Sequence, residues 1–323
     1  MTALLIISGL VLLIVGGDVM VRGAVSIATR LGVSPLVIGL TLVGFGTSTP
    51  ELVTSVQASL AGSPGIALGN IVGSNIANIL LILGVAALVA PIVISGAALK
   101  RDGAIMVAVA VMFAALTAAF DLTRPVGVVF ILLLVAYVVF SFRQEQTSPA
   151  DHGAAFDKGE AAGDVDPALR GERPTSLAIS IGMALGGLVL VVIGGKLLVD
   201  GAVALARGYG ISETVIGLTI VAVGTSMPEL VTSVVAALRR HSDVAFGNVV
   251  GSNIYNILGI AGVTALIAPT SVPPEMVRFD NLVMVAVSLL MVAVAWTGMR
   301  IGRREGGLLI AGYLAYLVAL WPS

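Results

Sequence analysis

The sequence predicts an all-α polytopic membrane protein of ten transmembrane helices, arranged as two inverted-topology repeats of five helices each. Three observations support this class. Of 323 residues, 58% are hydrophobic and 11% charged, whereas soluble domains carry about 25% charged residues. Apolar runs recur at the length of about 20 residues that a membrane-spanning helix needs. One polar motif occurs twice within these runs, and its two copies align in a single register without a gap.

Ten apolar segments are long enough to cross a bilayer. They cover approximately residues 3–29, 34–60, 65–90, 104–119, 125–142, 176–206, 212–238, 243–268, 281–298 and 305–321. The first run is longer than the apolar core of a signal peptide and lacks a basic flank, so we expect it to remain as a spanning helix. Cysteine is absent, which excludes disulfides, thiolate metal sites and cysteine catalysis.

The segment between the fifth and sixth spans differs in composition. Residues 143–175 are rich in Asp, Glu, Gly and Ala, with scattered Lys and Arg, and they show no hydrophobic period. Such a composition is typical of a solvated, mobile connector, whereas a regulatory domain, the alternative, would need more apolar content. We therefore divide the chain into a first five-helix repeat (1–142), a cytoplasmic linker (143–175) and a second five-helix repeat (176–323).

The distribution of Lys and Arg predicts the orientation, because cytoplasmic loops are enriched in both. With both termini outside, three basic residues face outward (Arg124, Arg207 and Arg278) and twelve face the cytoplasm. The twelve are Arg30, Lys100, Arg101, Arg143, Lys158, Arg170, Arg173, Arg239, Arg240, Arg300, Arg303 and Arg304. Five spans are an odd number, so the second repeat enters the membrane from the opposite side. Inverted repeats are typical of secondary transporters, and the expected location is the cytoplasmic membrane.

Several charges outside the motif receive structural interpretations. Asp18 and Arg22 in the first span, like Lys196 and Asp200 in the sixth, are opposite charges four residues apart. Such pairs can neutralise each other on one helix face, and a part in gating is the alternative. Asp243 directly precedes an apolar run, where we expect it to cap the N-terminus of the helix.

The repeated motif places acids and amides inside apolar sequence. It reads GTSTPELVTS from residue 46 and GNIVGSNIAN from residue 69, then GTSMPELVTS from residue 224 and GNVVGSNIYN from residue 247. Glu51 and Glu229 are the equivalent acids of the two copies. An ionisable group at membrane depth is costly unless it has a function, so both are candidate functional residues.

In the second span, Gly44, Gly46 and Pro50 predict a break, because proline removes a hydrogen-bond donor and clashes with the preceding turn. Within a bilayer, a break is tolerated where the freed carbonyls are buried or line a cavity. The polar residues on one face of this span are Thr47, Glu51 and Ser55, with Ser48 close beside them.

The third span adds further oxygen atoms. Gly69 and Gly73 allow close helix approach or unwinding, and Ser74 and Asn78 then lie on one face. The second repeat supplies the equivalents Thr225, Ser226, Glu229, Ser233, Ser252 and Asn256. Structural roles are the alternative for single members of this set, because membrane hydroxyls often bond to their own helix and glycines spaced by four often mark packing.

Together these residues form a candidate metal site of oxygen atoms. It combines two carboxylates, two amides and at least four hydroxyls, without His or Cys nearby. Oxygen donors without nitrogen or sulfur favour Ca²⁺ or Na⁺ over zinc or copper. Ca²⁺ takes about 6–8 oxygen ligands in flexible geometry, and this set is large enough to supply them.

The paired motifs Gly-Thr-Ser-x-Pro-Glu-Leu and Gly-Asn-x-x-Gly-Ser-Asn-Ile-x-Asn-Ile resemble the α-repeats of the calcium/cation antiporter superfamily, above all its prokaryotic sodium/calcium exchanger branch. The resemblance covers essentially the whole chain outside the linker. It implies that broken helices 2, 3, 7 and 8 hold the ions while helices 1 and 6 slide against them. The implied ligands are Glu51, Glu229, Thr47, Thr225, Ser48, Ser226, Ser74, Ser252, Asn78 and Asn256, with the carbonyls of Gly44 and Ala222.

One position departs from the family pattern. Well-known sodium/calcium exchangers carry Asp where Asn256 stands, so this pocket has two formal negative charges instead of three. The difference affects the expected number of Na⁺ ions and any K⁺ dependence. It also leaves exchange of protons for Ca²⁺ open.

The sequence thus predicts a secondary active antiporter that exchanges Ca²⁺ for Na⁺ by alternating access. Exchange of H⁺ for Ca²⁺ or another divalent cation is the first alternative, and a cation channel with an acidic ring is the second. An enzyme is not expected, because no hydrolytic dyad or phosphate-binding motif is present. We expect the transported ions and the lipid bilayer as partners, with no cofactor, no nucleic acid and no obligate protein partner.

Overall fold

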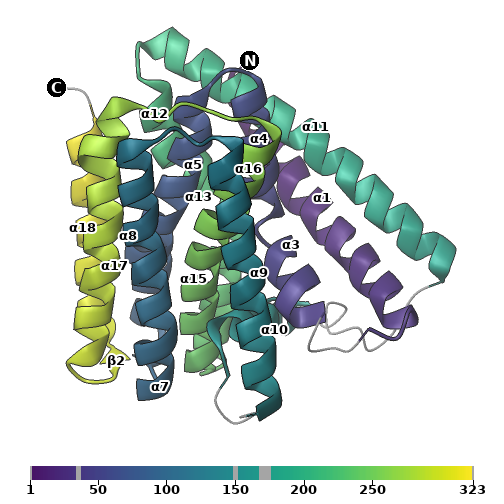
Figure 1. Ribbon diagram of the computed structural model, residues 1–323, viewed down its shortest axis with the longest axis vertical. Coiled ribbons are helices and arrows are strands. Elements are labelled where there is room, and N and C mark those ends of the chain that lie inside the picture. The colour runs from purple at the N-terminus through teal and green to yellow at the C-terminus, as the bar shows by residue number, and fades with distance from the viewer. Residues whose placement is uncertain (1, 34–37, 148–151, 167–175, 322–323) are drawn as a thin grey trace.

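The computed structural model describes residues 2–33, 38–147, 152–166 and 176–321, which form a bundle of helices (Figure 1). Within these ranges, seven helices are long and apolar enough to cross a membrane, or eight if the bent pair Glu213–Thr225 and Met227–Leu238 counts as one span. A helix satisfies all its backbone hydrogen bonds internally, which lipid requires. The all-α polytopic class is therefore confirmed.

The first half of the chain contains α1 (Thr2–Arg30), η1 (Gly39–Val43), α3 (Gly44–Gly46), α4 (Thr49–Leu60), α5 (Pro64–Ala77), η2 (Asn78–Ile82), α6 (Leu83–Val89), β1 (Ile92–Val93), α7 (Gly96–Ala98), η3 (Leu99–Gly103), α8 (Ala104–Ala119) and α9 (Arg124–Thr147). After α10 (Ala154–Val165), the second half contains α11 (Leu177–Tyr209), α12 (Glu213–Ile216), η5 (Gly217–Val221), α13 (Ala222–Thr225), α14 (Met227–Leu238), α15 (Ser242–Tyr255), η6 (Asn256–Ala261), α16 (Gly262–Ile267), η7 (Met276–Asp280), α17 (Asn281–Trp296), β2 (Arg300–Ile301) and α18 (Arg303–Leu320). Elements labelled η are π-helical turns.

The two halves repeat the same local structure. The helices α4 and α14 have 12 residues each, and α5 and α15 have 14 each. The two members of each pair begin at the same sequence offset that separates Glu51 from Glu229, as do the π-helical turns η1 and η5. The sequence repeat therefore specifies the helix ends as well as the motif.

The predicted breaks are present in two spans and absent from two. The chain leaves the helix after Gly46 and starts a new one at Thr49, and α13 and α14 meet at a 48° bend. The third and eighth spans, by contrast, are continuous helices from Pro64 to Val89 and from Ser242 to Ile267. The expectation that spans 3 and 8 are broken is wrong, because their glycines serve close packing and only a π-helical turn interrupts the α-helix.

The helices α1 and α11 pack side by side along one flank of the bundle (Figure 1). Their contact is antiparallel: Gly9 faces Gly194, and Gly23 faces Ala184 further along. Only 22% of the most apolar stretch of α11 is buried, against 83% in the central span that contains α5. The flank therefore presents apolar side chains outward, as a lipid-facing layer does. The expected Asp18–Arg22 pair is confirmed at 2.9 Å.

Short backbone pairings join the two halves at both ends of the bundle. Ile92 pairs with Ile301 in the antiparallel β1–β2 contact, and Leu122 forms an isolated bridge with Thr270. In Figure 1, α7, α10 and β2 lie at the lower end, whereas α12 and the end of α18 lie at the upper end. The orientation of these ends in the membrane remains a prediction. The linker positions Arg170 and Arg173 lie outside the described residues.

The linker contains a buried helix, which corrects the expectation of a solvated segment without regular structure. Helix α10 packs against α15, η1 and α14. Ala155 and Lys158 are fully buried, and Asp157 is 4% exposed. The small side chains that removed a hydrophobic period from this segment allow the helix to approach a glycine-bearing surface closely. The boundaries 143 and 175 of the linker remain predictions.

Candidate cation-binding site

The two repeated acids lie at the starts of helices that follow the breaks. Glu51 is in the first turn of α4 and Glu229 in the first turn of α14, and each is 1% exposed. Proline occupies an early position in both helices, where its missing N–H costs no intrahelical hydrogen bond. The break and the restart together deliver each carboxylate to the centre of the bundle, within electrostatic range of the other.

Each acid accepts a hydrogen bond from the other repeat. Ser48 Oγ donates to Glu229 Oε1 over 3.1 Å, and Ser226 Oγ donates to Glu51 Oε1 over 3.0 Å. Ser226 Oγ also lies 3.0 Å from Ser74 Oγ. Within the described chain, Oε2 of both acids is buried without a hydrogen-bond partner. These two oxygens are therefore available to a cation.

The repeated amides supply further oxygen atoms. Asn78 begins η2 and Asn256 begins η6, and both are nearly fully buried. Asn78 Nδ2 donates to Asn253 Oδ1 over 2.9 Å. The Oδ1 atoms of Asn78 and Asn256 have no hydrogen-bond partner among the described residues. A buried carbonyl oxygen without a donor is costly, and a bound cation would compensate that cost.

Two further asparagines hold the acid-bearing helices in place. Asn70 Nδ2 donates to the Glu51 carbonyl over 3.1 Å, and Asn248 Nδ2 donates to the Glu229 carbonyl over 3.2 Å. Ser55 and Ser233 accept from the same amides. These asparagines were not among the predicted site residues, although both occur in the repeated Gly-Asn-x-x-Gly sequence. Their recurrence at the same place in both copies of the motif was the available signal.

The predicted threonine ligands, and the carbonyls one turn before them, make different contacts in the two halves. Thr225 Oγ1 donates to Asn70 Oδ1 over 2.9 Å, and the Ala222 carbonyl lies 3.5 Å from Ser74 Oγ. Thr47 is only partly buried, and its hydroxyl donates to the Gly44 carbonyl over 3.4 Å. The structure thus brings Ala222 to the serine cluster. It does not place Thr47 in hydrogen-bonding contact with either acid.

Lys158 of α10 reaches the acids, and no sequence feature indicated it. Its Nζ donates to Ser252 Oγ over 2.5 Å and lies 3.3 Å from Glu229 Oε1. The side chain is fully buried. A buried ammonium among carboxylate and hydroxyl oxygens has the charge and the surroundings of a bound monovalent cation. The site therefore accepts a positive charge in this structure.

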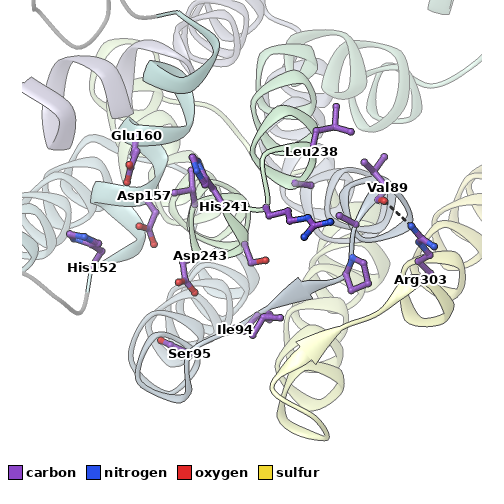
Figure 2. A pocket seen from close by; sticks show the side chains of 17 residues that line it. Val89, Ile94, Ser95, His152, Asp157, Glu160, Leu238, His241, Asp243 and Arg303 are labelled. Carbon is purple, nitrogen blue, oxygen red and sulfur yellow. Dashed lines mark hydrogen bonds between the residues drawn. The ribbon is translucent and has the colours of Figure 1, made fainter.

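A cavity of about 1040 Å³ opens beside α10 at the lower end of the bundle. Figure 2 shows Asp157 and Glu160 of α10 with Asp243 of α15 around it. Burial, then the nearby carboxylates of Asp243 and Asp102, raises the pKa of Asp157 well above its usual range. Asp243 lies within the first turn of α15, and His241 occupies the N-cap position, so the expected N-cap role is wrong. Its charge instead faces the cavity and the positive end of the helix dipole.

The chain is similar in sequence to known membrane proteins. The family model described as "Sodium/calcium exchanger protein" matches residues 1–143 and 179–321. The chain is 39% identical to the sodium/calcium exchanger MaX1 of Methanosarcina acetivorans over 344 residues, covering 98% of both chains. It is 34% identical to the inner membrane protein YrbG of Escherichia coli, covering 99% of this chain and 96% of that protein.

A solved structure of the sodium-calcium exchanger NCX_Mj, soaked with Na⁺ and Sr²⁺, matches with a TM-score of 0.63 and 32% identity, covering 99% of each chain. The family match covers both halves of the chain and leaves out most of the linker. The family is one of transporters, in agreement with the expectation that the chain is no enzyme. This chain belongs to the sodium/calcium exchanger protein family.

Proposed function

We propose that the chain is a secondary active antiporter that exchanges Ca²⁺ for Na⁺ across the cytoplasmic membrane by alternating access. The single observation that carries this proposal is the reciprocal pair of hydrogen bonds, from Ser48 to Glu229 and from Ser226 to Glu51. Each half of the chain completes the charged site of the other half. A rearrangement of one half against the other therefore remakes the site, as alternating access requires.

Electrostatics explains how this site exchanges ions without leak. Two buried carboxylates are costly in a dry, occluded state. One Ca²⁺ neutralises them, and so do two Na⁺ or two protons. The loaded carrier can then change its access while the empty carrier is held back. A channel would need a continuous pore, and the buried acids support an occluding carrier instead.

The proposal includes the topology and the ligands. Ten spans in two inverted repeats are supported by the recurrence of helix ends at a constant sequence offset. The proposed ligands are the two acids, the serines that contact them or their neighbours, and the amide oxygens without donors. These residues are Glu51, Glu229, Ser48, Ser226, Ser74, Ser252, Asn78 and Asn256. The hydroxyls of Thr47 and Thr225 and the carbonyls of Gly44 and Ala222 stay predicted ligands. The proposed orientation keeps both termini outside and the linker in the cytoplasm.

Flux measurements test this function directly. We expect purified chain in lipid vesicles to accumulate labelled Ca²⁺ when an outward Na⁺ gradient is imposed, and not when a proton gradient alone is imposed. Accumulation driven by the proton gradient would instead identify the alternative, H⁺/Ca²⁺ exchange. Flux without any counter-ion gradient dependence would identify a channel. Vesicles that contain Glu51→Gln protein serve as the control for leak.

A further inference from the structure

We propose that α10 is an autoinhibitory helix. While α10 is docked on α15, it prevents segment 39–46 of the first repeat from closing onto α15. Its Lys158 ammonium then takes the place of a transported cation beside Glu229 and Ser252. Inhibition by α10 rests on the proposed exchange function, whereas docking of α10 on α15 can be measured without transport. Three independent features of the structure support it.

The first feature is the contact between charge and site. Lys158 Nζ lies 2.5 Å from Ser252 Oγ and 3.3 Å from Glu229 Oε1, two residues of the candidate cation site. The side chain has no exposed surface. Burying an ammonium is costly unless it is paired, so Lys158 is stabilised there only while the site lacks a competing cation. Lys158 and a transported ion therefore exclude each other.

The second feature is the surface on which α10 lies. In the first repeat, Gly69 and Gly73 of α5 receive η5 and α13 so closely that a Cβ at Gly69 would come 2.9 Å from Gly217 Cα. Their equivalents, Gly247 and Gly251 of α15, receive α10. A Cβ at Gly251 would come 2.8 Å from the Ala154 carbonyl oxygen and 3.2 Å from Lys158 Cβ. Helix α10 thus covers the face of α15 that is equivalent to the face of α5 on which η5 and α13 pack.

The third feature is a hydrogen bond between the halves that one threonine of the repeat makes and its equivalent does not. Thr225 closes onto Asn70 with a 2.9 Å hydrogen bond. The equivalent pair is Thr47 and Asn248, but Thr47 donates to Gly44 and Asn248 Oδ1 has no partner among the described residues. Because α10 contacts both η1 and α15, it lies where the 39–46 segment would have to move. Withdrawal of α10 would free that path.

Ca²⁺ flux in the full-length chain tests the charge of Lys158. We expect Lys158→Gln to lower the KM for Ca²⁺, measured on the side of the membrane where α10 lies, about tenfold. This factor is expected if the docked state is about ten times as populated as the undocked state. Lys158→Arg keeps the charge and should retain a KM close to that of wild type. The maximal rate at saturating Ca²⁺ should change little, because excess Ca²⁺ displaces the tethered cation.

A second variant tests the docking surface without touching Lys158. A Cβ at Gly247 would overlap the Asp157 side chain, so Gly247→Ala should weaken docking and lower the same KM. Gly182→Ala is the matched control, since it makes the same change in α11, where no atom of the described residues lies within 4 Å of the added carbon. Both substitutions raise helix propensity equally, which leaves the contact with α10 as the difference.

Thiol labelling measures docking independently of transport. The chain has no cysteine, so Ala155→Cys provides one buried thiol on α10 and Val165→Cys an exposed one. We expect Ca²⁺ to accelerate labelling of Ala155→Cys in the purified protein and to leave Val165→Cys unchanged. Lys158→Gln in the Ala155→Cys background should label fast without Ca²⁺.

The outcomes separate the two proposals. If no variant shows counter-ion-driven flux but labelling at position 155 still responds to Ca²⁺, the exchange function is wrong and cation-coupled docking stands. If flux is Na⁺-driven but Lys158→Gln and Gly247→Ala keep the wild-type KM, α10 does not inhibit. Labelling of Ala155→Cys that is fast and independent of Ca²⁺ would overturn docking itself.

Discussion

Ser226 and Glu51 lie 175 residues apart in sequence and are joined by a 3.0 Å hydrogen bond from hydroxyl to carboxylate. The same relationship, with the halves exchanged, joins Ser48 to Glu229. Each serine ends the turn from which the acid-bearing helix of its own half starts, so it belongs to one half and binds the acid of the other. The site therefore exists only while the two halves are in register, and the following predictions depend on that property.

The two acids should be indispensable and equivalent. Glu51→Gln and Glu229→Gln each keep the side-chain volume and remove a charge that a cation needs. We expect Ca²⁺ flux in vesicles to fall to the level of empty vesicles, with the melting temperature retained. Glu275→Gln is the matched control, because Glu275 is an exposed acid away from the site. Robust flux in either site mutant would remove that acid from the ligand set.

The serines should contribute to affinity from across the repeat interface. Ser226→Ala removes the hydrogen bond to Glu51, and Ser48→Ala removes the one to Glu229. A single hydrogen bond contributes about 1 kcal/mol, which corresponds to roughly fivefold in affinity. We expect each substitution to weaken Ca²⁺ binding by about that factor, measured by calorimetric titration. A loss in one mutant and none in the other would show that the two half-sites bind unequally.

Asn256 should be a position that tunes the charge of the site. Its Oδ1 is buried without a partner among the described residues, and Asn256→Asp would add a third carboxylate. We expect Ca²⁺ binding to tighten roughly tenfold, equivalent to about 1.4 kcal/mol, and the Na⁺ dependence of flux to change. The measurement is Ca²⁺ flux against Na⁺ concentration at clamped potential. If both apparent affinities stay unchanged, Asn256 is a packing amide.

The predicted orientation can be tested with single cysteines at opposite ends of the bundle. Ala97 is exposed in α7 at one end, and Ser271 is exposed beyond α16 at the other. An impermeant thiol reagent applied to intact cells should label Ser271→Cys and spare Ala97→Cys. Inverted vesicles should give the opposite pattern. Labelling of Ala97→Cys in intact cells would reverse the assignment of both termini and of α10.

Docking of α10 should weaken as pH rises. The groups around Asp157 are the carboxylates of Asp243, Asp102, Glu160 and Glu145, and His152, His241 and Arg240 line the same cavity. Because burial raises the pKa of Asp157 in the docked state, docking binds a proton. It is therefore strongest below the ordinary pKa of 3.8 and is lost progressively as pH rises above that value towards the raised one.

Thiol labelling of Ala155→Cys, normalised to Val165→Cys, checks this pH dependence and cancels the intrinsic effect of pH on thiols. We expect the ratio to rise with pH in the wild-type background. Asp157→Asn removes the titrating group, so the ratio should then be independent of pH. A ratio that falls as pH rises would contradict the sign of the dependence.

The sequence by itself determined the membrane class, the repeat and the two central acids. The physical reason is that these features are local: apolar runs of spanning length, a motif repeated at a fixed offset, and carboxylates that lipid does not tolerate without a role. The breaks at Gly46 and at Ser226 were equally readable, since a proline close by removes a backbone donor. Each of these properties follows from the chain within a few residues.

Tertiary structure decided what depends on neighbours distant in sequence. Whether Gly69 and Gly73 unwind a helix or pack one depends on the partner surface, and close contact with Gly217 retained the helix. The pairing of each serine with the opposite acid required both halves in place. Lys158 illustrates the limit most clearly, because a lysine in a polar, small-residue linker gives no local sign of burial. The buried position of Lys158 is stable because the glycine-bearing face of α15 admits its helix and the Glu229 carboxylate pairs with its ammonium.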